Sequence, residues 1–454
     1  MKSTETLTAP RLQLATPVRG MAALTVVMML FFVMALVAGY TNRNLIFEQR
    51  ISANNYRATK ALEAADAGVE WAVAMLNGGR VSTSCQASNL PQDDDFRRRF
   101  LADAPEDSLN GPGGYSLAWG VNLAGRMFPS CINRDGVLTC ICPSSTVRAP
   151  EISAPADGVG SAFAVSFLLP GNDVRPGAIQ IATRGCASPG QGNSACFSQS
   201  SDTPLVDSVF NSLVTLGLVR ALPIAPPAAL TTGTTIDASA GRLLISNPDR
   251  QTAMAVNAGG AMTPGSGGID RLEGPSGSDA SDAARLVKTN DANLANLAAA
   301  PNDAWFRTNF GSDPAAFSRQ PATMLINCDA GCTWANLANV VASYPRNPIY
   351  VRGNLTLDPA VDVGSTQDPL MLVVNGTLTV ASTANITGFL HGASVVWTAA
   401  ATVRGAVMSA SNFTTSATTT IVYDAAALNT ISLRYGSFVR VPGSWNSEPN
   451  TVFR

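Results

Sequence analysis

The chain has 454 residues, with 30 Lys and Arg against 32 Asp and Glu, one His and eight Cys. Charged residues make up 14% of it, well below the ~25% of an ordinary soluble domain. The near-neutral balance argues against a nucleic-acid partner, since neutralising phosphates takes an excess of Lys and Arg. The single histidine, His391, excludes zinc motifs with two His ligands, and the sequence lacks a GxxxxGK[ST] phosphate loop and a G-x-S-x-G nucleophile turn. We therefore expect a structural or binding protein of two or more units, without a cofactor, rather than an enzyme.

Residues 21–40 form an uncharged apolar run, MAALTVVMMLFFVMALVAGY, which is long enough to cross a membrane as a helix. The alternative is a secretory signal peptide, but its apolar core would be shorter and a small-residue cleavage site would follow it. Instead, the polar sequence TNRNLIFEQR follows directly. The short N-terminal tail and the cysteines further along favour a C-terminal part outside the cytoplasm.

The helical pattern continues beyond the apolar run, because no proline occurs between Pro17 and Pro91. Apolar residues at helical spacing fall on one face of the second half, namely Leu62, Ala65, Val69, Val73 and Leu76. The sequence Asn77-Gly78-Gly79 is a helix stop. We predict one helix over residues 21–77, within an N-terminal helical region of residues 21–79.

The residues of this region resemble a known family. Arg19-Gly20 precedes the apolar run, and FEQRISANNYRATKALEAADAGVEWA follows it. This order is similar to the N-terminal region of type IV pilus minor pilins of the PilX type, over about residues 18–77. The matching positions in the second segment are Glu48, Arg50, Asn54, Ala61, Ala64, Ala65 and Ala67, while Ser52 and Asp66 stand where Ala and Glu are usual.

The resemblance implies a class III leader peptide over residues 1–20, which a prepilin peptidase cuts after Gly20. It also implies methylation of the new N-terminus at Met21. The fifth mature position is Thr25, where major pilins carry Glu, and this departure fits a subunit at the tip or at initiation. The implied partners are other minor pilins, the major pilin, the inner-membrane assembly machinery and the membrane itself.

Residues 80–345 are expected to form a mixed middle domain stapled by disulfides, with an exposed flexible loop at 257–279. Local spacing favours Cys186 with Cys196 and Cys328 with Cys332. Four further cysteines would share two bridges in an open arrangement, namely Cys85, Cys131, Cys140 and Cys142. A thiolate metal site on Cys131, Cys140 and Cys142 is the alternative, but no CxxC pair supports it. Asp93–Asp95 and Arg97–Arg99 are interpreted as a solvated turn and helix start.

Residues 346–454 are predicted to form a β-solenoid, because short segments rich in β-branched residues repeat every 17–23 residues from Pro348 onward. The segment 351–357 superposes on 374–380. We favour a right-handed parallel β-helix of about four rungs over the alternative of a β-sandwich. His391 is expected at a corner of a rung, with polar partners, and residues 423–445 resemble the closing segment of long PilX-type proteins. Across 371–420 the only charged residue is Arg404, which argues against a polysaccharide lyase site.

The expected fold class is thus α+β: a long transmembrane and amphipathic helix, a middle domain with disulfides and a parallel β-helix. The expected function is a minor pilin in type IV pilus assembly or initiation at the tip, with surface adhesion. It would lie in the inner membrane, with its C-terminal part periplasmic, and then in the pilus at the cell surface. The alternatives are a pilus-tip adhesin whose main role is ligand binding, and the tip pseudopilin of a type II secretion system.

Overall fold

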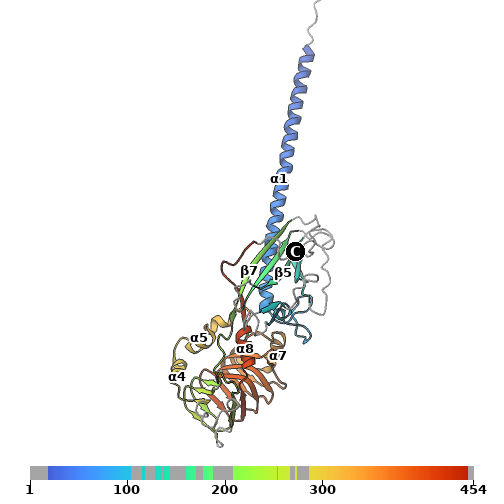
Figure 1. The fold of residues 1–454 in the computed structure, drawn as a ribbon. Helices are drawn as coiled ribbons and strands as arrows, with labels where there is room; N and C mark the ends of the chain where they lie inside the picture. The colour runs from blue at the N-terminus through green and yellow to red at the C-terminus, as the bar shows by residue number, and fades with distance from the viewer. Residues whose placement is uncertain are drawn as a thin grey trace, which may run out of the picture. The chain divides into compact units, whose positions relative to one another are not determined.

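The computed structural model describes residues 19–103, 115–117, 128–134, 136–143, 160–169, 177–187, 208–252, 254–265, 271–273 and 286–447 (Figure 1). The chain forms two units, residues 1–57 and residues 58–454. Both units contain part of the first helix. Within the described residues, the second unit contains a large antiparallel sheet, a large parallel sheet and a small antiparallel pair of strands.

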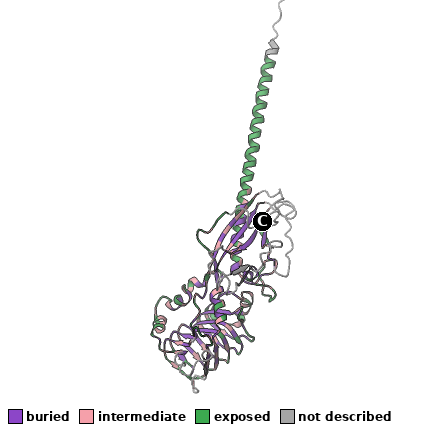
Figure 2. Ribbon diagram, viewed as in Figure 1, coloured by how far each residue is buried: buried purple, intermediate pink, exposed green. Residues whose placement is uncertain are grey.

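Helix α1 runs from Arg19 to Asn77 without a break, which confirms the long helix and its end at Asn77. Gly78 donates a backbone hydrogen bond to the Met75 carbonyl at 3.1 Å, which closes the last turn. Residues 23–56 of α1 are exposed along their whole length (Figure 2). Because this stretch includes most of the apolar run, it needs lipid or partner helices to cover it.

The second half of α1 packs against a six-stranded antiparallel sheet, and Figure 1 shows β5 and β7 beside it. The strand order is β22-β7-β6-β5-β3-β4. Their bounds are β3 Ser130–Arg134, β4 Val137–Ile141, β5 Ser161–Leu168, β6 Ala178–Cys186, β7 Val209–Arg220 and β22 Gly436–Arg440. The short helix α2 (Phe96–Phe100) adds two phenylalanines to the same core, and a small separate pair, β1 (Leu101–Asp103) and β2 (Tyr115–Leu117), follows it.

The buried face of α1 differs in part from the predicted face. Residues of low exposure repeat at helical spacing, namely Ala61, Ala64, Ala65, Val69, Ala72 and Leu76. Leu62, which is predicted on the same apolar face as Ala65 and Leu76, is 39% exposed. Small residues are buried instead because the backbones of helix and sheet approach closely, and a Cβ added at Gly185 of β6 would collide with the backbone of Ala61 and Ala65.

We predict that Gly185→Ala lowers the free energy of unfolding of the second unit by about 3 kcal/mol, because the extra methyl group meets backbone that cannot move aside. Gly217→Ala in β7 is the matched control, since a Cβ there meets only Val441 Cγ2 at 3.6 Å. Urea denaturation of the purified protein in detergent measures the free energy of unfolding of both variants. Equal stabilities of the two variants would contradict the close approach.

The other sheet contains fourteen strands, and all its pairings are parallel. We call it the parallel stack. Its strands are β8 Ala228–Thr232, β9 Ile236–Asp237, β10 Arg242–Ser246, β11 Met254–Ala258, β12 Met262–Thr263, β13 Arg271–Glu273, β14 Val287–Lys288, β15 Met324–Thr333, β16 Ile349–Leu357, β17 Leu370–Val380, β18 Asn385–Trp397, β19 Thr402–Ser409, β20 Phe413–Thr415 and β21 Thr418–Val422.

The repeat found in the sequence is present in the stack. Val351 pairs with Val374 and Leu355 with Leu378, which confirms the superposition of 351–357 on 374–380. One inward row continues through Leu378, Val395, Phe413 and Ile236, so each strand buries an apolar side chain on the next.

The stack also reaches further toward the N-terminus than residue 346. Strands β8, β9 and β10 pair on one side with β19, β20 and β21, and on the other side with β11, β12 and β13. The boundary expected at residue 346 therefore falls inside the stack, between β15 and β16, which pair with each other.

The parallel stack is an insertion into the antiparallel sheet. Strand β7 ends at Arg220, and its neighbour in the sheet is β22, which begins at Gly436. Ala221 donates its N–H to the Tyr435 carbonyl at 2.9 Å, so residues 221–435 leave and rejoin the sheet at one point. After helix α8 (Ala425–Arg434), the C-terminal segment thus completes the antiparallel sheet rather than only closing the repeat.

Helices cover parts of the stack. Helices α4 (Ala292–Ala299), α5 (Ala304–Phe310) and α6 (Pro314–Ser318) lie between β14 and β15 in the chain, and α7 (Trp334–Ser343) follows β15. Aromatic residues of α5 and α6 are buried against the stack, namely Trp305, Phe306, Phe310 and Phe317.

His391 lies under this helical cover, which corrects its expected place at a rung corner with polar partners. It is 3% exposed and packs in T-shaped arrangements with the rings of Phe306 and Phe310, at centroid distances of 6.0 and 5.1 Å. Neither ring nitrogen has a hydrogen-bond partner among the residues that the structure describes. Burial therefore lowers the pKa of His391 from 6.5 to about 3.

This burial predicts an acid-sensitive stability. Between pH ~6.5 and ~3 the unfolded chain binds a proton at His391 and the folded chain does not, so stability is complete above pH ~6.5 and falls as the pH drops. The slope is about 1.4 kcal/mol per pH unit. Urea denaturation at pH 7, 6 and 5 should show a steeper loss for the wild type than for His391→Leu. Parallel pH curves for the two proteins would contradict a neutral buried histidine.

Candidate functional site

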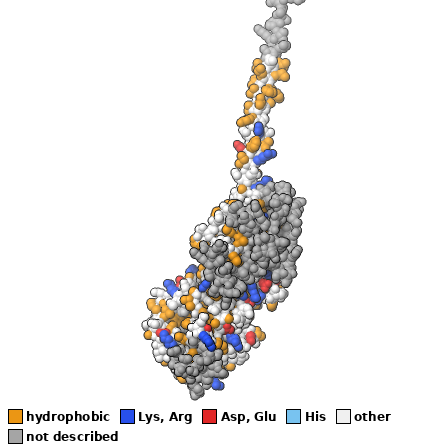
Figure 3. Space-filling model, in the orientation of Figure 1, with side chains coloured by type: hydrophobic (Ala, Val, Ile, Leu, Met, Phe, Trp, Pro, Cys, Tyr) orange, Lys and Arg blue, Asp and Glu red, His pale blue; other side chains and the backbone are white. Residues whose placement is uncertain are grey.

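The residues expected at the N-terminal processing site lie in the first turns of α1. The Gly20–Met21 bond falls directly after the helix start at Arg19, and Thr25 lies one turn further on. The helix is long and apolar enough to cross a membrane, with a mean hydropathy of 2.4 in its most apolar window. Figure 3 shows the hydrophobic side chains along this part of α1, followed by Lys and Arg side chains.

Three disulfides lie within the described residues. Cys328 bonds to Cys332, the pairing that their spacing favours, while Cys131 bonds to Cys140 and Cys85 to Cys142. The two bridges left open by the sequence are therefore a hairpin bridge between β3 and β4 and a bridge from the loop after α1 to the end of β4. Cys186 is disulfide-bonded as well, but Cys196 lies outside the described residues.

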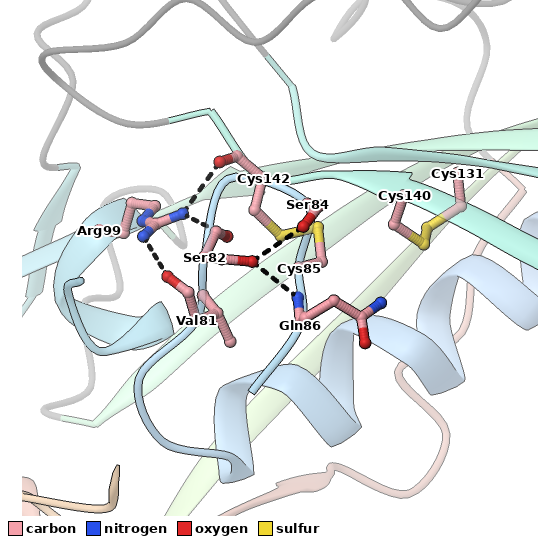
Figure 4. Close-up of a disulfide and its surroundings, with 9 residues drawn as sticks. All are labelled: Val81, Ser82, Ser84, Cys85, Gln86, Arg99, Cys131, Cys140 and Cys142. Carbon is pink, nitrogen blue, oxygen red and sulfur yellow. Dashed lines mark hydrogen bonds between the residues drawn. A yellow bond between two sulfur atoms is a disulfide. The ribbon is translucent and has the colours of Figure 1, made fainter. Parts of the chain in front are cut away.

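Arg99 holds the loop of the Cys85–Cys142 bridge in place. Its guanidinium donates to the carbonyls of Ser82 at 3.1 Å, Cys142 at 2.9 Å and Val81 (Figure 4). The side chain is 5% exposed, and burial lowers its pKa. A charged group thus replaces water as the donor for three buried carbonyls.

A second buried arginine, Arg97, joins the end of α1 to the insertion. It donates to the carbonyls of Leu76, Arg434 at 3.1 Å and Gly436 at 2.6 Å. Its guanidinium carbon lies 4.8 Å from the centroid of the Phe438 ring. One side chain therefore contacts the last turn of α1, the end of α8 and the start of β22.

The last residue of α1 completes this contact. Asn77 accepts a hydrogen bond from the Phe438 N–H at 2.8 Å and donates to the Phe438 carbonyl at 2.9 Å. From the parallel stack, Asn347 donates to the Asn77 carbonyl at 3.0 Å and to the Ala322 carbonyl at 2.8 Å. We call Asn77, Arg97 and Asn347 the junction.

Charged groups surround the junction. Arg346 pairs with Asp368 at 2.8 Å, and the exposed Arg98 reaches the same carboxylate at 3.2 Å. Asp95 is 4% exposed and caps α2 by accepting from the Arg98 N–H. Burial raises the pKa of the Asp95 carboxyl, and the positive charges of Arg97 and Arg346 oppose that rise.

The interpretation of Asp93–Arg99 as a solvated turn is correct for the helix start but wrong for three of its charges. Asp95, Arg97 and Arg99 are buried, while Arg98 is exposed. The available signal was the flanking pair Phe96 and Phe100, which predicts a buried helix around the arginines. Among the described residues, no group of His, Cys, Asp or Glu side chains could hold a metal ion.

Comparisons with known proteins bear on the N-terminal helix. Residues 19–70 match the family model described as PilX N-terminal. The match covers a minority of the chain, which thus carries a pilin-like N-terminal segment. A comparison with curated proteins found no match. Among solved structures, the competence-associated pilin ComZ from Thermus thermophilus aligns with 10% identity and a TM-score of 0.23, over 87% of this chain and 98% of that chain. That score is too low to indicate a shared fold.

We predict that Arg97→Met lowers the free energy of unfolding by about 3 kcal/mol, because it leaves buried carbonyls without donors. Arg98→Met is the control, since Arg98 is 47% exposed and its ion pair with Asp368 is worth only ~0–1 kcal/mol. Thermal unfolding of both variants in detergent measures the difference. If Arg97→Met and Arg98→Met were equally stable, the junction would not stabilise the contact of α1 with α8 and β22.

Proposed function

We propose that the chain is a minor pilin that takes part in type IV pilus assembly or initiation, at or near the pilus tip. The observation that carries this proposal is α1 itself. Its exposed apolar first half lies within the PilX N-terminal match, and its second half forms the core of an antiparallel sheet. One helix therefore supplies both a packing element for a membrane or filament and an anchor for a folded body.

Thr25 supports a place at the tip or at initiation. A carboxylate buried among packed apolar helices costs free energy unless a cation pairs with it. A threonine at the fifth mature position removes that requirement. A subunit with no neighbour above its N-terminus then loses nothing by lacking the acid.

The proposal includes the processing and location that the resemblance implies. A prepilin peptidase cuts after Gly20, Met21 becomes the methylated N-terminus, and the C-terminal part lies in the periplasm until assembly brings it to the pilus. The partners are the other minor pilins, the major pilin and the inner-membrane machinery. The role is structural, without catalysis.

We also propose that the parallel stack winds as a β-solenoid, with a right-handed turn. The support is that the three successive strands β8, β9 and β10 pair in order with β19, β20 and β21 on one side. On the other side they pair in order with β11, β12 and β13. Such a body presents flat outer faces, which suits adhesion. A tip adhesin whose main role is ligand binding is thus the second candidate. A tip pseudopilin of a type II secretion system would share the same N-terminal features.

Complementation tests the proposal. A strain lacking the gene should make fewer surface pili, and the wild-type chain should restore them with a mature N-terminus at Met21. Gly20→Val should stay uncleaved and fail to restore piliation, because a side chain obstructs close approach to the backbone. Gly39→Ala, in open space on the same helix, is the control. Normal piliation without the gene, or a mature N-terminus elsewhere, would overturn the proposal.

A further inference from the structure

One outer side of the parallel stack carries a straight row of small polar side chains. Strand pairing aligns Thr333, Thr356, Thr379, Val396, Thr414, Asp237 and Thr263 across seven strands. Each central member alternates with buried neighbours, as Thr356 does between Leu355 and Leu357. The row therefore points outward, and all its members are exposed or half-exposed.

A second row runs beside it and is ordered by its own hydrogen bonds. The Asn354 side chain accepts from the Thr377 N–H at 2.8 Å, and the Thr377 hydroxyl lies 3.0 Å from the Ser394 hydroxyl. Asn412 lies on the next strand layer and Thr235 on the one after it. We call the two rows together the hydroxyl face.

The hydroxyls of the central row are free to bind a ligand. Within the described part of the chain, those of Thr356, Thr379 and Thr414 make no hydrogen bond. Their χ1 angles are restricted by β-branching, so little side-chain entropy is lost on binding. The helices α4 to α6 cover a different side of the stack, the one that contains His391.

The chemistry of the hydroxyl face selects one class of ligand. It contains no Lys or Arg, which a nucleic acid or another polyanion would require. Its one large apolar side chain is Val396, too little for an amphipathic helix. Hydroxyl and amide groups that both donate and accept match a neutral polyhydroxyl chain. Successive rungs repeat every ~4.8 Å, which is comparable with the length of one sugar unit.

We propose that the hydroxyl face binds a neutral polysaccharide, whose chain lies across the strands and meets Thr356, Thr379 and Thr414, with Val396 between the last two. Each contact is weak, and affinity comes from repetition along the polymer. The inference rests on the proposed function, because the face meets surface glycans only when the stack is displayed outside the cell.

Binding of the full-length protein in detergent to cellulose and chitin particles, and to a panel of soluble neutral and anionic glycans, tests the proposal. The triple variant T356V/T379V/T414V removes the hydroxyls and keeps the β-branched shape. We expect it to bind at least tenfold more weakly than the wild type. The matched control is T402V/T418V/T420V, which changes half-exposed threonines on another side of the stack and should bind like the wild type.

Three results would overturn the assignment: no binding to any neutral glycan, binding to anionic glycans only, or equal binding by both triple variants. Pilus counts separate this outcome from the proposed function. The T356V/T379V/T414V chain should restore piliation in the deletion strain although it no longer binds glycan. If deletion of the gene leaves the pilus number normal, the assembly role is wrong. Glycan binding by the purified protein is then still tested by the comparison of the two triple variants.

Discussion

The pairing of β7 with β22 is the constraint on which the second unit depends. These neighbouring strands are separated in the chain by the whole parallel stack. Arg220 pairs with Gly436 at the end of the ladder, and the Ala221 N–H donates to the Tyr435 carbonyl beside it. Loop-closure entropy rises only slowly with loop length, so a long insertion is tolerated when its own fold brings its ends together. The stack does so, because β8 near its beginning pairs with β19 near its end.

The junction makes the insertion and the helix end one body. Asn77 and Arg97 bond to backbone at the point where the chain returns from the stack, and Asn347 adds a contact from the stack itself. Arg97 also donates to the Leu76 carbonyl, and Asn347 donates to the Asn77 carbonyl, so two carbonyls that the end of a helix cannot satisfy alone have partners. The polar Asn77 at the end of α1 is thus explained by its hydrogen bonds to Phe438 of β22.

The sequence predicted features that depend on local pattern. The helix and its stop at Asn77-Gly78 follow from apolar spacing and glycine, and the 351–374 register follows from a repeat within one run of the chain. The earlier strands of the stack could not be found in that way. Strands β9, β12 and β14 have two residues each, too short for any periodicity, and their partners are distant in sequence.

The buried charges escaped prediction for a different reason. Arg97 and Arg99 look like surface residues because charged side chains usually lie in water. Phe96 and Phe100 indicate a buried helix, but the partners of the two arginines, Phe438 and Cys142, are too distant in sequence to be predicted. His391 is the opposite case. Its strand neighbours are apolar, but the aromatic cover from α5 comes from residues 304–310, which no local pattern connects to it.

The way the stack is attached has a mechanical consequence for an anchored protein. If ligand is held on the stack while α1 is held among other helices, tension passes through the chain at residues 221 and 435 and through the junction beside them. Strand β22 is bound to β7 by a ladder of five residue pairs, and Asn77 bonds to Phe438 within that strand. A pull on the stack is therefore resisted by this ladder and by the hydrogen bonds between Asn77 and Phe438.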